Sequence, residues 1–240
     1  MITALIFAGG TGMRMNSKSR PKQFLELHGK AIIIHTLEFF EEHDEIDNIA
    51  VVCLESWMEH LKHIIKRNGF EKIKWYINGS KTGQGSIYNG LKTIYQYSEN
   101  PSEDIVLIHD GVRPLITSEL ISTCINSVKK NGNAITVTPV KETIVTVEEN
   151  TVISTTPREI TKIAKAPQCF YLEDIMKIHN KALSDGIISS TDSASLMLKY
   201  NKTLYTVDGP AENIKITTPL DYYIFRAIYE ARENSQILGY

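Results

Sequence analysis

The chain has 240 residues, near the upper end of what one domain holds and enough to bury a sizeable core. Hydrophobic residues make up 42% of it and charged residues 22%, which excludes a disordered, collagen-like or coiled-coil protein. With 26 Lys and Arg against 28 Asp and Glu, the net charge of −2 indicates no nucleic-acid or membrane partner, although a local basic cluster can still bind a small anion.

The cysteines and the first residues indicate where the protein works. Cys53, Cys124 and Cys169 lack CxxC spacing, so we expect neither a disulfide framework nor a zinc site. The apolar run at 2–7 has no basic leader, and no apolar stretch reaches the roughly 18 residues that a membrane span needs. We therefore expect a cytoplasmic protein in a reducing compartment.

Strand-like and helix-like segments alternate along the chain. Short runs rich in β-branched and apolar residues predict strands at 3–7, 49–53 and 105–108. Apolar residues at helical spacing predict helices around 57–65, 87–95, 118–131, 172–183 and 221–231. Ser118 is the expected N-cap of the third of these helices, and Gly132 is its expected stop. The alternation predicts an α/β fold, with a mainly parallel sheet covered by helices on both faces.

One segment departs from this alternation. Residues 142–156 form two β-rich runs around Glu149 and Asn150, which is a hairpin signal. The hairpin has too few large apolar residues to bury itself, so it either packs on a second subunit as a protruding arm or folds onto its own domain. Since no linker or repeat is present, we expect one domain over 1–240 with a β-arm at about 140–160.

The first predicted strand runs directly into a glycine-rich segment. It reads Ala8, Gly9, Gly10, Thr11, Gly12, Met13, Arg14. Glycines after a strand let backbone N–H groups turn towards an anion, and the basic residues that follow, among them Lys18, Arg20 and Lys22, suit a polyphosphate. The spacing matches neither the Walker loop nor the dinucleotide fingerprint, which disfavours a nicotinamide-dependent reductase.

These residues, AGGTGMRM and then PKQFLEL, resemble the cytidylyltransferases that activate polyol phosphates. That family includes the methylerythritol-phosphate enzymes of isoprenoid synthesis and the ribitol-phosphate enzymes of teichoic-acid and capsule synthesis. The resemblance continues through IHDGVRP, PVKET, Arg158, APQCF, TDSAS and NIKITT, in that order. It implies a Rossmann-like fold, a homodimer formed by the β-arm, and Mg²⁺-dependent transfer of CMP from CTP to a polyol phosphate with release of pyrophosphate.

The resemblance also implies roles for individual residues. Arg14, Lys22 and Lys215 match the catalytic cations: the first two lie on the triphosphate, and the third touches the α-phosphate and the incoming phosphate. Asp110 matches the carboxylate near Mg²⁺. The CTP contacts implied are Ala8, Gly9, Gly10, Thr11, Gly12, Arg14, Lys22, Ser86 and Asp110, and the polyol-phosphate contacts are Arg113, Thr143, Arg158 and Lys215. The nucleophile in the family is the substrate's own phosphate oxygen, so the protein positions it and stabilises charge.

Two departures and the choice of acceptor stay open. Gly83 stands where the family usually has an arginine, and Ala166 replaces a common threonine. The missing arginine leaves room for a non-catalytic nucleotide-binding subunit. The segments AGGTG, PKQFLEL, VRPLIT and KITT favour D-ribitol 5-phosphate as acceptor, giving CDP-ribitol. The segments SIYNGL and TDSAS instead resemble the 2-C-methyl-D-erythritol 4-phosphate branch. Another alditol phosphate is the third alternative.

Overall fold

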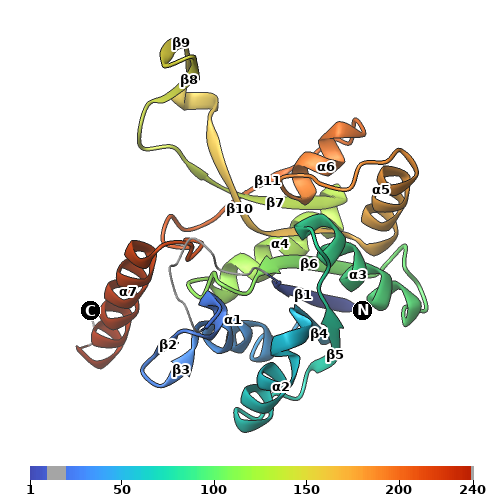
Figure 1. Cartoon of the computed structure of the whole chain (residues 1–240), viewed down its shortest axis with the longest axis vertical. Helices are drawn as coiled ribbons and strands as arrows, with labels where there is room; N and C mark the ends of the chain where they lie inside the picture. Colours follow the sequence, from blue (N-terminus) through green and yellow to red (C-terminus); the bar gives the residue numbers. More distant parts are fainter. Residues whose placement is uncertain (10–19, 239–240) are drawn as a thin grey trace.

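A seven-stranded sheet forms the centre of the molecule (Figure 1). The structure, a computed structural model, describes residues 1–9 and 20–238. The strands, in spatial order, are β11 (Thr206–Asp208), β7 (Asn133–Pro139), β10 (Lys162–Tyr171), β6 (Ile105–Asp110), β1 (Ile2–Ala8), β4 (Asn48–Cys53) and β5 (Ile73–Asn78). All neighbouring pairs are parallel except those of β10, which runs antiparallel to both β6 and β7. The predicted α/β fold with a mainly parallel sheet is confirmed.

Helices cover both faces of this sheet, because successive residues of a strand point to opposite sides. In β1, Ile6 belongs to the core beneath α1 (Ile32–Glu41), α2 (Met58–Arg67) and α4 (Ser118–Asn131). Its neighbour Leu5 belongs to the opposite core, beneath α3 (Gly83–Gln96), α5 (Leu172–Ser184) and α6 (Ser193–Lys199). In β4, Val51 and Val52 divide in the same way. A strand flanked by two apolar layers reads as a continuous apolar run, as the sequence does here.

A third core joins the last helix to the rest. The helix α7 (Pro219–Leu238) buries Phe225 against Leu27 and Ile32, beside the two-stranded sheet of β2 (Glu26–Leu27) and β3 (Lys30–Ala31). Among the described residues, the remaining elements are the 3-10 turns η2 (Lys22–Phe24), η3 (Glu55–Trp57) and η4 (Arg158–Ile160). Within residues 1–9 and 20–238, no helix has the length and apolarity needed to cross a bilayer.

The ends of α4 show one correct and one wrong prediction. Gly132 ends the helix in a left-handed conformation with φ of 89°, which glycine adopts without strain. The N-cap, however, is Thr117 and not Ser118, because the Thr117 side chain accepts the hydrogen bond from the backbone N–H of Leu120. Ser and Thr are both favoured caps, so the choice between neighbours depends on which backbone φ and ψ the preceding loop imposes.

The predicted hairpin is present as β8 (Ile144–Glu148) and β9 (Thr151–Thr156), paired antiparallel. Its turn residues, Glu149 and Asn150, have φ of 45° and 67°, the positive values of a tight hairpin turn whose twist matches its strands. In Figure 1 the hairpin stands away from the body, and every residue of both strands is exposed. In this chain it therefore forms a protruding arm.

Candidate active site

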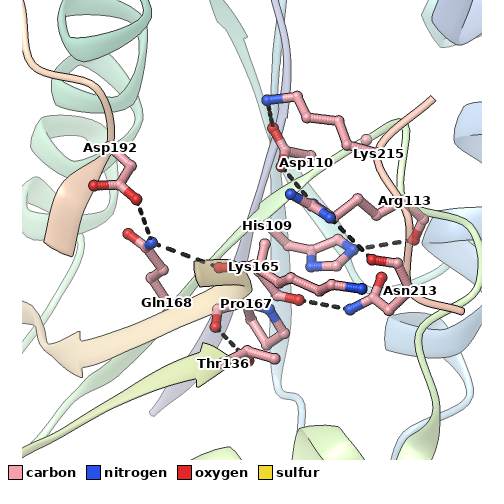
Figure 2. Close-up of polar contacts among 12 residues, drawn as sticks. His109, Asp110, Arg113, Thr136, Lys165, Pro167, Gln168, Asp192, Asn213 and Lys215 are labelled. Carbon is pink, nitrogen blue, oxygen red and sulfur yellow. Dashed lines mark hydrogen bonds and ion pairs between the residues drawn. The ribbon is translucent and has the colours of Figure 1, made fainter. Parts of the chain in front are cut away.

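Asp110 ends β6 at the edge of the sheet where β1 also ends, and two cations surround it (Figure 2). Its Oδ1 lies 2.6 Å from Nζ of Lys215, and its Oδ2 accepts a 2.8 Å hydrogen bond from Nε of Arg113. Burial opposes ionisation of Asp110, but the charges of Lys215 and Arg113 outweigh burial and hold its pKa well below the usual range. Asp110 is therefore a carboxylate at neutral pH and fixes both cations.

The loop that carries Lys215 is fastened to β10 by side chains. Asn213 donates from Nδ2 to the carbonyl of Ala166 at 2.7 Å, and its own carbonyl accepts from Nη1 of Arg113 at 2.9 Å. Lys165 donates from Nζ to the carbonyl of Ala211 at 2.7 Å. These bonds place Lys215 against Asp110 although its own side chain is partly exposed, with 40% of its surface open. The Lys215 side chain is thus held in position while part of it remains open to solvent.

A cavity of about 230 Å³ opens beside these residues. Asp110, Arg113, Lys165 and Lys215 line its charged side. The remaining walls come from β1, β6, β10, the start of α3, α5, the segment before α6, and α6 itself. Their residues are Phe7, Gly83, Gln84, Ile87, Ile108, His109, Ala164, Ala166, Gln168, His179, Ser190, Thr191, Asp192, Ser193 and Leu196. The cavity is smaller than pockets for drug-sized ligands, which are roughly 300–1,000 Å³, so it suits a small polar molecule.

Gln168 holds one wall of the cavity in place. Its Nε2 donates to Oδ2 of Asp192 at 2.9 Å, and its Oε1 accepts from the backbone N–H of Ala194 at 2.9 Å. Asp192 in turn caps α6 by accepting from the backbone N–H of Ser195 at 2.8 Å. The TDSAS segment is thereby tied to the centre of the sheet.

Hydrogen bonds and close packing hold a second group of residues in place at the end of β1. Gln23 donates from Nε2 to the carbonyl of Ala8 at 2.7 Å, which places Lys22 beside the strand end. A Cβ at Gly9 would come within 2.8 Å of the Phe7 ring, so a larger residue there would have to displace that ring. Ser86, almost fully buried in the first turn of α3, donates to the carbonyl of Thr82 at 2.9 Å. Thr82 is the N-cap of that helix, and its side chain accepts from the backbone N–H of Gly85.

Similarity to known proteins decides the family. The model of the IspD family, 2-C-methyl-D-erythritol 4-phosphate cytidylyltransferase, matches residues 2–231. The chain belongs to this family. Its α/β sheet is thus that of a cytidylyltransferase fold.

Individual relatives of this cytidylyltransferase differ in the acceptor that they are named for. A ribitol-5-phosphate cytidylyltransferase of Streptococcus agalactiae is 49% identical over 240 residues, covering 100% of both chains. A 2-C-methyl-D-erythritol 4-phosphate cytidylyltransferase of Geotalea uraniireducens is 37% identical over 231 residues, covering 96% of this chain and 97% of its own. The solved 4-diphosphocytidyl-2C-methyl-D-erythritol synthase of Anaerococcus prevotii superposes with a TM-score of 0.81 at 30% identity, over 95% of this chain and 96% of that one.

The structure brings together part of the residue set that the resemblance implies for the cytidylyltransferase. Asp110, Arg113 and Lys215 are in direct contact, and Ala8, Gly9, Lys22 and Ser86 lie around the end of β1. Gly10, Thr11, Gly12 and Arg14 lie outside the described residues. The contacts of all these residues with CTP stay predictions.

Thr143 and Arg158 lie elsewhere, at the base of the arm. Nη2 of Arg158 donates to Oγ1 of Thr143 at 3.4 Å, so the two residues form a pair, but neither lines the cavity beside Asp110. Both are exposed. This pair therefore lies apart from the group around Asp110, and its contact with the acceptor stays a prediction.

Sequence reasoning missed several cavity residues. Lys165, Gln168 and Asp192 received no role, and neither did Gln84 and His179. APQCF and TDSAS were visible as motifs, but only the fold shows that Gln168 of the first pairs with Asp192 of the second. Gln84 stands next to Gly83, which lines the same cavity, so the departure at Gly83 marked the right loop.

Two buried histidines at this cavity predict a dependence of stability on pH. Burial lowers the pKa of both His109 and His179 from 6.5 to about 4. The unfolded state therefore binds more protons than the folded state between pH 6.5 and 4. Lowering the pH through this window should reduce the free energy of unfolding by about 3 kcal/mol per histidine.

Urea unfolding at pH 7, 5.5 and 4 measures this effect. Both buried histidines contribute to the change in the free energy of unfolding with pH. The variant His179→Phe removes one of them, so it should lose about half of their joint contribution. The exposed His63 offers the matched control, His63→Phe, which should keep the full slope. An unchanged slope in His179→Phe would show that this histidine is already protonated in the folded protein.

Proposed function

We propose that the chain transfers CMP from CTP to D-ribitol 5-phosphate, releasing pyrophosphate and forming CDP-ribitol for polymers of the teichoic-acid or capsule type. The observation that carries this proposal is the full-length identity of 49% to a protein named for ribitol 5-phosphate, against 37% to one named for methylerythritol phosphate. The buried free thiols of Cys53, Cys124 and Cys169 fit a protein of the reducing cytoplasm.

The charged groups at the end of β6 support this chemistry. An oxygen of the acceptor's phosphate attacks the α-phosphorus of CTP, forming the new P–O bond as the bond to pyrophosphate breaks. Two anions must approach each other in this step, and negative charge accumulates on the departing pyrophosphate. In the proposal Lys215 neutralises the meeting phosphates, while Lys22 and Arg14 lie on the triphosphate and stabilise the leaving group. Asp110 and Arg113 hold Lys215 in place.

Mg²⁺ is the cofactor that we propose, with Asp110 as its protein ligand. Among the described residues, no three His, Cys, Asp or Glu side chains gather to hold a metal ion. A magnesium ion bound by one carboxylate together with substrate phosphates and waters needs no such cluster. Although both oxygens of Asp110 have a cationic partner, each keeps a free lone pair for a metal. Bound there, the ion would neutralise phosphate charge.

A homodimer completes the proposal. The arm and the strand beside it expose large apolar side chains, a composition that favours burial against another chain. These are Ile144, Val145, Val147, Val152, Ile153, Ile160 and Ile163. A second copy would cover this surface and would bring its own Arg158 and Thr143 towards a cavity that lacks them.

Charging the arm should produce a monomer. Val147 and Val152 are opposite each other in the hairpin and are 54% and 58% exposed, so aspartates at both positions would place two like charges in the interface. Sedimentation should show a dimer for the wild type and a monomer for Val147→Asp with Val152→Asp. Thr151→Asp changes the neighbouring cross-strand pair and serves as the control. A double variant that stays dimeric would place the interface elsewhere.

The function is tested by pyrophosphate release from CTP and Mg²⁺ across a panel of acceptors. The panel holds ribitol 5-phosphate, methylerythritol 4-phosphate, glycerol phosphate, arabinitol phosphate and mannitol phosphate. Ribitol 5-phosphate should give the highest kcat/KM. A higher kcat/KM with methylerythritol 4-phosphate would establish that compound as the acceptor, the alternative that the SIYNGL and TDSAS segments favour. Nucleotide binding without turnover on any acceptor would indicate a non-catalytic subunit.

A further inference from the structure

Three buried side chains at the cavity have polar atoms without hydrogen-bond partners among the described residues. Neither ring nitrogen of His179 has a partner, and neither does Oε1 of Gln84 or Nδ1 of His109, whose Nε2 faces the carbonyl of Arg113. The two histidines are 1% exposed and Gln84 is 6% exposed, and all three line the cavity. Buried polar groups in native proteins are almost always hydrogen-bonded, so several unpaired atoms around one small cavity mark a place where a polar molecule would bind.

The surroundings of these atoms define the chemistry of that ligand. His179 comes from α5 and Gln84 from the first turn of α3, where Ile87 and Leu196 add apolar wall. The cations Arg113, Lys165 and Lys215 belong to the opposite group, which β10 and the loop after β11 hold around Asp110. The cavity therefore has a cationic side for phosphate and, at His179 and Gln84, a neutral side for something else; the carboxylate of Asp192, which also lines the cavity, is held by Gln168 and by the backbone of Ser195.

A hydroxyl group matches the neutral side. Because burial lowers its pKa to about 4, His179 is neutral at pH 7 and offers one N–H donor and one nitrogen acceptor. Gln84 uses its amide N–H on the carbonyl of Ile187 at 2.8 Å, which leaves an acceptor oxygen. A hydroxyl both donates and accepts, so it can pair with the two residues. A phosphate, which only accepts, would leave Gln84 unsatisfied.

We infer that His179 and Gln84 bind the hydroxyl at the end of the acceptor chain farthest from its phosphate, and that they select for this hydroxyl. The inference rests on the proposed function, since it takes ribitol 5-phosphate as the acceptor. With the phosphate at Lys215, the unbranched chain crosses the cavity between its apolar walls and presents the C1 hydroxyl to α3 and α5. An acceptor with a methyl group there would leave both buried side chains unpaired, as they are without ligand.

The test compares ribitol 5-phosphate with 1-deoxyribitol 5-phosphate. The wild type should prefer the former by about 10- to 100-fold in kcat/KM, the cost of leaving buried donors and acceptors unpaired. His179→Phe keeps a ring that can stack on Tyr88, 6.1 Å away between centroids, but removes both nitrogens. It should lose about 10- to 100-fold with ribitol 5-phosphate, chiefly through KM, and less than about twofold with the deoxy compound. The KM for CTP should not change.

Further variants separate recognition from a structural role. Gln84→Met should reduce the same preference independently of His179, and His179→Asn, which retains a donor and an acceptor, should restore part of it. Tyr88→Phe is the matched control: the Tyr88 hydroxyl bonds Asn180 at 3.1 Å, and Tyr88 does not line the cavity. This control should keep the wild-type preference.

The outcomes are distinct. Equal losses with both acceptors in His179→Phe and Gln84→Met would assign these residues a structural role and overturn the inference, leaving the proposed function intact. An unchanged preference in both variants would overturn it as well. If the wild type does not turn over ribitol 5-phosphate, the proposed function is wrong. The same comparison with the acceptor that does react, and with its terminal deoxy analogue, then decides the role of the two residues.

Discussion

Replacing Lys215 with methionine should lower kcat about 100- to 1000-fold, because a preorganised cation at developing charge contributes on that scale. Lys215 is held at 2.6 Å from Asp110 and still has 40% of its side chain exposed, which is the placement expected of a group that meets substrate. Methionine retains the length of the side chain and removes the charge. Arg113 remains paired with Asp110 in the variant, so the carboxylate is not left alone and the fold should persist.

Single-turnover and steady-state pyrophosphate release measure this loss. Lys215→Arg keeps the positive charge with a different geometry and should fall between methionine and wild type. Lys177→Met is the matched control, because Lys177 forms an exposed ion pair with Glu173 on α5 and does not line the cavity. Wild-type turnover in Lys215→Met would show that the cation acts on the fold and not on the phosphates.

Truncating Arg158 to alanine should reduce activity about 10- to 100-fold, the loss expected when a charge-assisted bond to phosphate disappears. Arg158→Lys should lie between wild type and alanine, because lysine keeps the charge without the bidentate geometry. Calorimetry should show unchanged affinity for CTP, since the residues placed around the end of β1 belong to a different part of the fold. Loss of CTP affinity with intact acceptor affinity would contradict the assignment.

Mixing subunits tests whether Arg158 acts across the dimer. Arg158→Ala and Lys22→Ala proteins, each nearly inactive alone, should recover about a quarter of wild-type activity when mixed equally and allowed to exchange. Half of the dimers would then be mixed, and each mixed dimer would contain one site with both residues intact. Without recovery, Arg158 would belong to the site of its own subunit, and its proposed bond to the acceptor's phosphate would still stand.

Several features of this protein follow from its sequence by itself, because their physical cause acts over a few residues. Gly132 ends α4 because glycine adopts positive φ without strain. The β-rich runs on either side of Glu149 and Asn150 predict the turn between them. Leu5 and Ile6 face opposite cores because side chains alternate along any strand. The parallel α/β class follows from such local periods repeated along the chain.

Other features depended on the tertiary structure, because they join residues far apart in the chain. No local pattern predicts that β10 runs antiparallel between β6 and β7, yet this placement brings Lys165 and Gln168 to Asp110. The pairing of Gln168 with Asp192 bridges 24 positions, and the contact between Lys215 and Asp110 joins the ends of two distant segments. Hydrogen bonds and ion pairs of this kind form wherever the folded chain places complementary groups together. Only the three-dimensional arrangement therefore decides which polar residues meet. It also decides which ones, such as His179, are buried without a hydrogen-bond partner among the described residues.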